Sequence, residues 1–468
     1  MKKKIIIISV ICVIICFIFG FLVFKKQAKN PIYKPEVSDN YCRQENASER
    51  VKCLMKVDEI PSLKLTSEKE IDYTYHKWNK NISVELDDEK LPEAKIKTRG
   101  NTTYTAGTIY GAYNYKIKFD KAVDLFGFGK SDKWVLLPNL IDYSNIRQFY
   151  FSNLAQVIMG DYWSPQMKYV ELYINDEYRG LYLVAESIEE TENRLNLTDN
   201  SFIAQLEQGR LWRLWQETED EYFLIDDEAK PCSNYEQLKG AEKHKTMYTL
   251  EYPESFSDIS KERGDEIKNS VNDLMNSARE HKPFDLLNLD VDSAVNFYLF
   301  DELFYNSGMG SSSVYMYQYE NSPITLGPLW DFDQLTLENV GEGFVRPGTC
   351  DNNLYRYLLR YPEFREKLKT KLEWFKNEVA PTAKQELDNL QNNKILRAAI
   401  ERNQTLHPTW GKKADGVNVW QNEKIIELKN WDEHVNWIRE ILYTGRTWEG
   451  KKYQGRVDWL LEHFDEIK

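Results

Sequence analysis

The sequence predicts an α+β protein in which a mostly antiparallel β lobe precedes a helical lobe. Alternating apolar and polar residues, separated by turn-forming residues, dominate residues 61–255, whereas helical spacing dominates residues 256–450. Strands that precede helices, instead of alternating with them, are typical of α+β domains. The chain has 468 residues and is 42% hydrophobic. It is therefore long enough to bury a large core.

The first 26 residues predict a membrane anchor. Residues 5–24 form an uncharged apolar run between "MKKK" and the pair Lys25 and Lys26. About 20 apolar residues suffice to cross a bilayer core of roughly 30 Å. No small-residue cleavage signal follows, so we predict an uncleaved signal anchor over residues 1–26. Basic residues at the N-terminus favour keeping that end in the cytoplasm, which makes the chain a single-pass cell-membrane protein with an extracytoplasmic body.

The remaining elements follow from local patterns. Residues 27–60 are polar without a strong period, which predicts an extracytoplasmic stalk. Residues 61–450 carry the folded domain, and residues 451–468 are predicted to form a helical end. Ser144 is expected to cap a helix over "SNIRQFYFSNLAQVIMG". The predicted strands are "ISVELDD", "AKIKTRG", "YNYKIKFD", the hairpin "YVELYINDEYRGLYLVAESIE", and the pair "SVYMYQY" and "ITLGPLWDFD".

Charge and cysteine content limit the partners. The net charge is −13, and about −18 without the five lysines beside the apolar run, which disfavours nucleic acid. We expect a protein substrate or cell-surface partner that is basic or serine-rich. Four cysteines lie outside the apolar run, and Cys42 with Cys53, or Cys232 with Cys350, are possible disulfides in an oxidising compartment. The sequence leaves the pairing open. It contains no C-x-x-C, so no metal cluster is expected.

Several enzyme classes lack their motifs. The chain has no H-E-x-x-H, no G-x-S-x-G and no G-x-x-x-x-G-K-[ST]. Two carboxylates, Asp331 and Asp333, end "ITLGPLWDFD" and would suit a glycosidase, which the aromatic content also permits. If the strand continues, however, their side chains point to opposite faces. This geometry argues against an acid/base pair and leaves a single metal-facing carboxylate.

Five sequence blocks occur in order over roughly residues 60–450, namely "KTRGNTTY", "YKIKFDKAVDLFGFGKSDKWVLLPNLIDYSNIRQFYFSNLA", "VELYINDEYRGLYLVAESIE", "FDELFYN" and "LGPLWDFD". These blocks resemble the CotH kinase family, the spore-coat protein CotH and its relatives. The resemblance implies an atypical protein-kinase-like fold that transfers phosphate from ATP to serine on a protein, with Mg or Mn. Asp331 matches the family's metal-binding Asp, and Asp333 is a second candidate.

The sequence departs from the family pattern at the catalytic loop. In "NSGMGSSSVYMY", Gly308 stands where the catalytic Asp is expected, and Ser313 stands where the second metal ligand is expected. Glycine cannot accept a proton. Two hypotheses follow. In one, the chain is an active kinase in which Asp301 or Asp333 replaces the missing base. In the other, it is a pseudokinase or scaffold that acts by binding protein or cell-wall partners.

The cofactor-binding residues are also less well matched. The family's leading Lys falls near Ala112 or Tyr113, so Lys116 and Lys118, which share a strand face, are candidates for phosphate contact. Glu186 would be the acidic partner of such a lysine. Arg147 pairs either with Asp142 or with a phosphate. The predicted cofactor-binding residues are Arg99, Asn101, Lys116, Lys118, Arg147 and Glu186.

Overall fold

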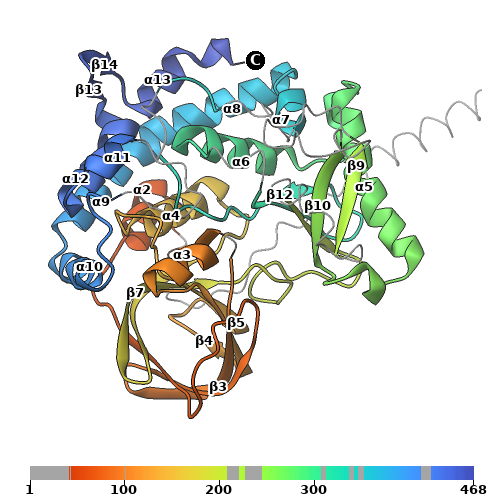
Figure 1. Ribbon diagram of the computed structural model, residues 1–468. Coiled ribbons are helices and arrows are strands. Elements are labelled where there is room, and N and C mark those ends of the chain that lie inside the picture. The colour runs from red at the N-terminus through yellow and green to blue at the C-terminus, as the bar shows by residue number, and fades with distance from the viewer. Residues whose placement is uncertain are drawn as a thin grey trace, which may run out of the picture.

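The computed structural model confirms the α+β class and contains two antiparallel-rich sheets and a helical body. It describes residues 42, 44–100, 102–207, 221–226, 245–306, 312–336, 342–345, 353–412 and 423–467. Figure 1 shows the barrel strands and the second sheet beneath helices from the C-terminal half of the chain. The predicted membrane anchor lies outside the described residues, and no helix within them is long and apolar enough to cross a bilayer.

Seven strands close into a barrel in the order β1-β2-β3-β4-β5-β7-β6. All neighbours are antiparallel except β1 and β6, whose parallel pairing closes the barrel. Alternate residues fill the interior with apolar side chains such as Ile96, Ile117 and Trp134. The strands are β1 (Ser62–Thr66), β2 (Asn79–Leu86), β3 (Glu89–Thr98), β4 (Tyr115–Asp124), β5 (Lys130–Leu137), β6 (Met167–Ile174) and β7 (Glu177–Glu186).

The predicted hairpin is confirmed as β6 and β7. Its turn is shorter than "NDEYRG", because only Asn175 and Asp176 separate the strands. Both residues have positive φ, 51° and 62°. A two-residue turn with positive φ at both positions matches the right-handed twist of the strands, and Asn and Asp tolerate it.

A second sheet lies beside the barrel and has the order β12-β11-β8-β10-β9. Its middle is formed by segments far apart in the sequence, since β11 pairs with β8. The predicted strand pair is confirmed as β11 and β12, although β12 ends at Leu326. The strands are β8 (Phe202–Leu206), β9 (Tyr222–Asp226), β10 (Lys245–Tyr252), β11 (Val314–Gln318) and β12 (Thr325–Leu326).

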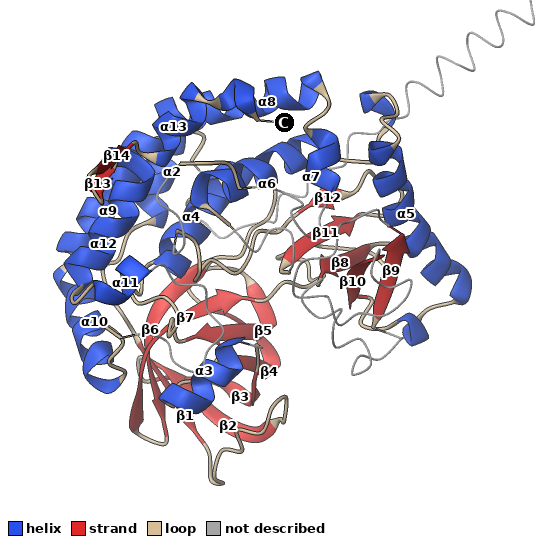
Figure 2. Ribbon diagram, turned by 45° about the horizontal axis from the view of Figure 1, so that its top comes forward, coloured by secondary structure: helices blue, strands red, loops and turns tan. Residues whose placement is uncertain are grey.

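The helices pack around one large apolar core that also includes residues of both sheets, such as Val135 and Phe202. Figure 2 shows these helices arching over the barrel, with the second sheet and α5 to one side. The helices are α2 (Ala47–Leu54), α3 (Thr102–Tyr110), α4 (Arg147–Met159), α5 (Lys261–Arg279), α6 (Val291–Phe304), α7 (Asn353–Leu358), α8 (Pro362–Trp374), α9 (Ala380–Asn392), α10 (Lys394–Leu406), α11 (Glu423–Glu427), α12 (Trp431–Arg439) and α13 (Arg456–Glu462). The C-terminal end also contains a small hairpin, β13 (Arg446–Trp448) and β14 (Lys451–Tyr453).

Part of the predicted stalk belongs to the folded body. Helix α2 contacts α4 and α9, and its Val51 is fully buried. Cys42 is disulfide-bonded to Cys53, which confirms the first of the two possible disulfides. Cys232 and Cys350 lie outside the described residues. The stalk prediction therefore does not hold for the helix at residues 47–54, whose apolar face the sequence analysis missed.

Candidate functional site

The two carboxylates of "WDFD" lie in a loop and not in a strand. Strand β12 ends at Leu326, and Asp331 has a positive φ of 70°. The side chain of Asp331 is exposed, whereas Asp333 is buried. The strand alternation expected for the two carboxylates does not apply, because both lie beyond the end of β12. A non-glycine residue with positive φ costs free energy and often occurs at functional sites.

Asp331 is connected to a second carboxylate through Ser313. The Ser313 hydroxyl donates to Oδ2 of Asp331 at 3.1 Å, and the Ser313 backbone N–H donates to Oε1 of Glu207 at 3.4 Å. Ser313 also has a positive φ, of 60°. Desolvation by the surrounding protein raises the pKa of Asp331, whereas the hydrogen bond from Ser313 and the charge of Arg99 lower it. We call Glu207, Ser313 and Asp331 the carboxylate site.

A group of cations lies on the outer face of β3 and β4. Lys97 pairs directly with Lys116 across the two strands, and both alternate with buried residues. Arg99 extends the pairing by one residue, since its N–H donates to the Asn114 carbonyl at 3.0 Å. Lys95 lies two residues before Lys97 on the same face. We call Lys97, Arg99 and Lys116 the basic strand face.

The basic strand face carries uncompensated charge. Among the described residues, none of its three cations forms an ion pair with a carboxylate. Burial, followed by the neighbouring cations, lowers the pKa of Lys116. Burial and Arg99 also lower the pKa of Lys97, although Glu254 opposes this shift. Clustered cations without partners are costly unless an anion joins them, so this surface is suited to anion binding.

An aromatic contact joins the basic strand face to the carboxylate site. The Arg99 guanidinium lies over the Trp330 ring, 5.8 Å from its centroid, and Trp330 directly precedes Asp331. Burial raises the pKa of Tyr315 of β11. Among the nearby charges, Arg99 lowers this pKa and Asp331 raises it. The barrel thus supplies cations, and the loop after the second sheet supplies a carboxylate, at adjacent positions.

Lys133 is a cation near this surface that the sequence analysis missed. Its Nζ lies 3.6 Å from Oε2 of Glu189, and the two side chains are 17% and 3% exposed. Burial opposes the charged lysine, but Glu189 and its acidic neighbours outweigh it and raise the pKa of Lys133. Strand alternation in "SDKWVLL" places Lys133 on the outer face, so the signal for the lysine was present. Glu189 follows β7 in a segment without periodicity, so nothing in the sequence indicated this partner.

Glu186 is buried against an arginine and not against a strand lysine. Its Oε1 lies 3.6 Å from Arg194 Nε, and its Oε2 accepts from the Gln166 N–H at 2.9 Å. Burial raises the pKa of Glu186 to about 7, although the charge of Arg194 lowers it. Lys118, the other predicted phosphate ligand, forms an ion pair with Asp132 at 3.3 Å. The expected pairing of Glu186 with Lys116 or Lys118 is therefore replaced by two separate pairs.

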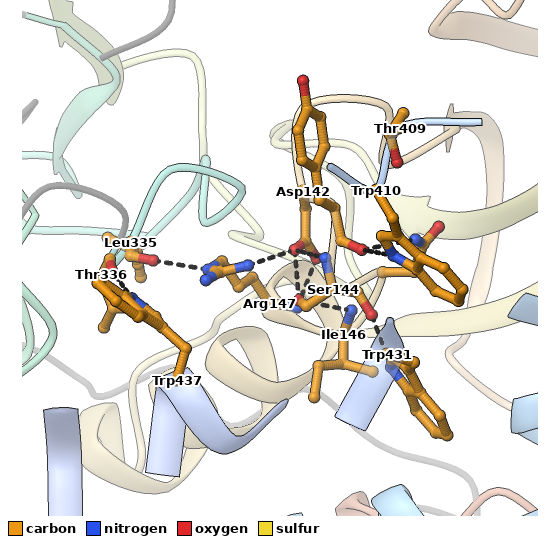
Figure 3. Close-up of polar contacts among 12 residues, drawn as sticks. Asp142, Ser144, Ile146, Arg147, Leu335, Thr336, Thr409, Trp410, Trp431 and Trp437 are labelled. Atoms are coloured by element: carbon orange, nitrogen blue, oxygen red, sulfur yellow. Dashed lines mark hydrogen bonds and ion pairs between the residues drawn. The ribbon is translucent and has the colours of Figure 1, made fainter. Parts of the chain in front are cut away.

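Arg147 forms the centre of a buried polar cluster (Figure 3). Its Nη1 lies 2.8 Å from Oδ1 of Asp142, and its Nε donates to the Leu335 carbonyl at 2.9 Å. Both side chains of the ion pair are fully buried. Of the two alternatives, pairing with Asp142 is the one observed. Arg147 thereby connects the start of α4 to the loop that carries Asp331.

The same cluster corrects the start of α4. The helix begins at Arg147, and the Ser144 hydroxyl donates to Asp142 instead of capping the helix. Oδ2 of Asp142 accepts from the Arg147 N–H at 2.6 Å, so Asp142 satisfies a free donor at the helix start. Three tryptophans from the C-terminal half of the chain donate indole hydrogen bonds to backbone carbonyls around the cluster. The indole N–H groups of Trp410, Trp431 and Trp437 donate to the carbonyls of Tyr143, Ser144 and Thr336.

A comparison with protein families decides the classification. The family model described as CotH kinase protein matches residues 96–448. The chain belongs to the CotH kinase family. No curated protein matches the chain significantly. The CotH match includes the basic strand face from Lys97 onward, the Arg147 cluster and the whole carboxylate site.

The two proposed substitutes for the CotH catalytic Asp are buried. Asp301 lies in α6, fully buried, and accepts from Nδ2 of Asn306 at 2.7 Å. Burial raises the pKa of Asp301, and that of Asp333, well above the usual range. Asp333 Oδ1 has no hydrogen-bond partner among the described residues. Both carboxyls are therefore buried, whereas that of Asp331 is exposed.

Two further predicted positions of the CotH pattern are outside the described residues, namely Gly308 and Asn101. Across the described ranges, no group of three or more His, Cys, Asp or Glu side chains gathers as a metal site. The carboxylate site instead combines two carboxylates with a hydroxyl. Glu207 was missed because it directly follows β8 in a segment without any motif, and only the pairing of β8 with β11 brings it near Ser313.

Proposed function

We propose that this CotH-family chain is a membrane-anchored, extracytoplasmic protein kinase that phosphorylates serine on a protein substrate with ATP. The observation that carries the proposal is the position of exposed Asp331 beside the uncompensated basic strand face. Phosphoryl transfer needs cations to gather the phosphates and a carboxylate to hold the metal ion. Both are present at neighbouring positions.

The residues of the carboxylate site fit Mg or Mn. Carboxylate and hydroxyl oxygens are the ligands that these hard cations prefer, and Asp331, Ser313 and Glu207 supply them. A bound ion would offset the charge of the transferred phosphate. Asp331 would be the principal ligand because its side chain is open to solvent. Ser313 holds Asp331 in place through its hydroxyl, and Glu207 holds Ser313 through its backbone.

The basic strand face would bind the ATP phosphates. Arg99 and Lys116 are partly buried, lack ion pairs in the described part of the chain, and lie on the side of the barrel nearest Trp330. Lysine binds phosphate as a compact charge, whereas arginine offers a planar fork of donors.

The extracytoplasmic location is supported by two independent features. The uncharged run at residues 5–24 is long enough for a membrane anchor. The disulfide between Cys42 and Cys53 lies at the start of the folded body. Structural disulfides persist in oxidising compartments and are rare in the cytosol.

The test compares two variants of the full chain, purified in detergent and incubated with labelled ATP, Mn²⁺ and a serine-containing protein. Asp331→Asn keeps a residue that tolerates positive φ but removes the charge. Asp176→Asn is the matched control, because Asp176 is also exposed with positive φ and lies in the hairpin turn. We expect Asp331→Asn to lower the rate of labelling roughly 10³-fold. The control should match the native chain. Equal labelling by both variants would refute the proposal.

The second candidate function is a nucleotide-binding pseudokinase that acts as a scaffold. Gly308 favours it, since glycine at the expected catalytic position offers no proton acceptor. In that case ATP with Mn²⁺ raises the Tm of the native chain, as any ligand of the folded state does, but no label is transferred. Neither labelling nor a rise in Tm would exclude both candidates.

A further inference from the structure

The cations on the barrel extend well beyond the carboxylate site. Behind Lys97 and Lys116, three further lysines lie side by side on three neighbouring strands. Lys95 pairs with Lys118, and Lys118 pairs with Lys133, in the strand register. We call Lys95, Lys118 and Lys133 the lysine row. Neighbouring strands are about 4.8 Å apart, so the row is roughly 10 Å wide.

The lysine row is only partly neutralised. Asp132 pairs with Lys118 and Glu189 pairs with Lys133, while Glu190 and Glu254 also act on Lys133. Lys95 has no ion pair within the described residues. Its Nζ lies over the Trp78 ring, 4.7 Å from the centroid, beside Lys97 at 4.9 Å. The indole face orients both ammonium groups without cancelling their charge.

Repulsion between neighbouring lysines of the row lowers the stability of the fold. Like charges directly opposite each other on neighbouring strands are destabilising, by about 0.2–1 kcal/mol for each pair. A surface that only needed solubility would alternate the two signs of charge. An anion bound at the lysine row would offset the repulsion among its lysines.

The nucleotide does not account for the whole surface. Arg99 is the cation in contact with Trp330 and hence the one nearest Asp331. Lys95 is four residues earlier on the same face, which places it roughly 13 Å along the strand. The proposed ATP phosphates would occupy the Arg99 end with Lys116. The Lys95 end is left for another anionic group.

We propose that the lysine row, together with Trp78, binds an acidic segment of the protein substrate beside its acceptor serine. This inference rests on the kinase function proposed above and adds a substrate class to it. Residues on one face of an extended peptide are about 7 Å apart, so two or three carboxylates span a row of this width. The net charge of the chain predicted a basic partner, but the charge at the site itself determines which segment docks there.

A short acidic peptide fits better than a long polyanion. The whole chain has a net charge of −13. Beyond the basic strand face and the lysine row, the field of the protein therefore repels extended anions such as nucleic acid. A short segment meets only the local positive surface.

The experiment measures both binding and turnover with the full chain in detergent. Three fluorescent serine peptides differ only in their flanks, which carry Glu, Gln or Lys. Binding without ATP is followed by anisotropy, which does not depend on catalysis. Lys95→Glu reverses the charge at the free end of the row. Lys90→Glu is the matched control, since Lys90 is exposed on the same strand but outside both cationic groups.

We expect the native chain and Lys90→Glu to bind the Glu peptide at least tenfold more tightly than the Gln peptide. Lys95→Glu should remove this preference and leave the KM for ATP unchanged. Equal binding of all three peptides would overturn the proposal. It would also be overturned by a rise in the KM for ATP in Lys95→Glu, which would assign the row to the nucleotide, or by equally tight binding of a DNA duplex. Binding of the Glu peptide without any phosphate transfer would refute the kinase function while retaining the docking site.

Discussion

Two regions of this molecule carry cations at low exposure, and they differ in whether those cations have partners. In the helical body, Arg147 is paired with Asp142 at 2.8 Å and Arg456 with Glu302 at 2.5 Å, all four fully or almost fully buried. On the barrel, Lys97 and Lys116 face each other and have no ion pair among the described residues.

The difference separates structural from functional charge. A buried cation with a buried carboxylate partner needs no anion from outside the chain. A cluster of cations without partners is incomplete until an anion binds. From sequence, Arg147 and Arg99 were equal candidates for phosphate contact. The structure assigns Arg147 to the fold and leaves Arg99 beside Trp330, at the edge of the carboxylate site.

The comparison is tested most strongly by removing one arginine from each region. Arg147→Met should destabilise the chain by about 3–5 kcal/mol, because it leaves the Asp142 charge buried without a partner. Arg99→Met should change stability by less than about 1 kcal/mol, because Arg99 has no ion pair to lose among the described residues. Urea unfolding of both variants measures the contrast. Comparable losses in the two variants would show that the regions are not distinct.

A smaller effect is expected within the basic strand face. Lys116→Met should lower kcat/KM for ATP about tenfold to hundredfold, because one phosphate contact is lost. The same change should raise the Tm slightly, since it relieves repulsion by Lys97 and Lys133.

The control for this prediction is Lys64→Met. Lys64 is a strand lysine on the same barrel, and it forms an exposed ion pair with Asp88. Removing it should leave the activity unchanged and should not raise the Tm, because surface pairs contribute little. A Lys116→Met variant that is both less stable and fully active would assign Lys116 to the fold.

Periodicity was sufficient to predict the α+β class and several of the strands, but not the closure of the barrel or the order of the second sheet. The alternation in "YNYKIKFD" predicted which side of β4 is buried, and the sequence also predicted the hairpin of β6 and β7. The start of α4 could not be predicted, because its capping residue, Asp142, lies five residues before Arg147. Asp142 accepts a hydrogen bond from the Arg147 backbone N–H and also forms a buried ion pair with the Arg147 side chain. Helix α2 was missed because its apolar face is short, although Asn46 caps its start, and its packing against α4 and α9 is long-range.

The candidate site was predictable only where one motif carries it. Asp331 and Ser313 were found from the family pattern, and the structure joins them by a hydrogen bond. Glu207 and Lys133 depend on pairing between strands and on burial, which the sequence does not record. The partner of Glu186 was predicted as a strand lysine but is Arg194. Ion pairs between residues far apart in the sequence could therefore not be predicted from the sequence.

The smallest expected effect concerns the pH dependence of the buried pair Glu186 and Arg194. The pKa of Glu186 is raised from 4.5 to about 7, chiefly by burial. The folded state therefore binds this proton more tightly than the unfolded state, and the stability it contributes is lost as pH rises from about 4.5 to about 7. Glu186→Gln does not titrate. Relative to the native chain, its free energy of unfolding should rise by on the order of 1–2 kcal/mol between pH 4.5 and pH 6. Urea titrations at several pH values measure this difference. A stability gap that is constant with pH would show that Arg194 keeps Glu186 ionised throughout, and the pair would then resemble Arg147 and Asp142.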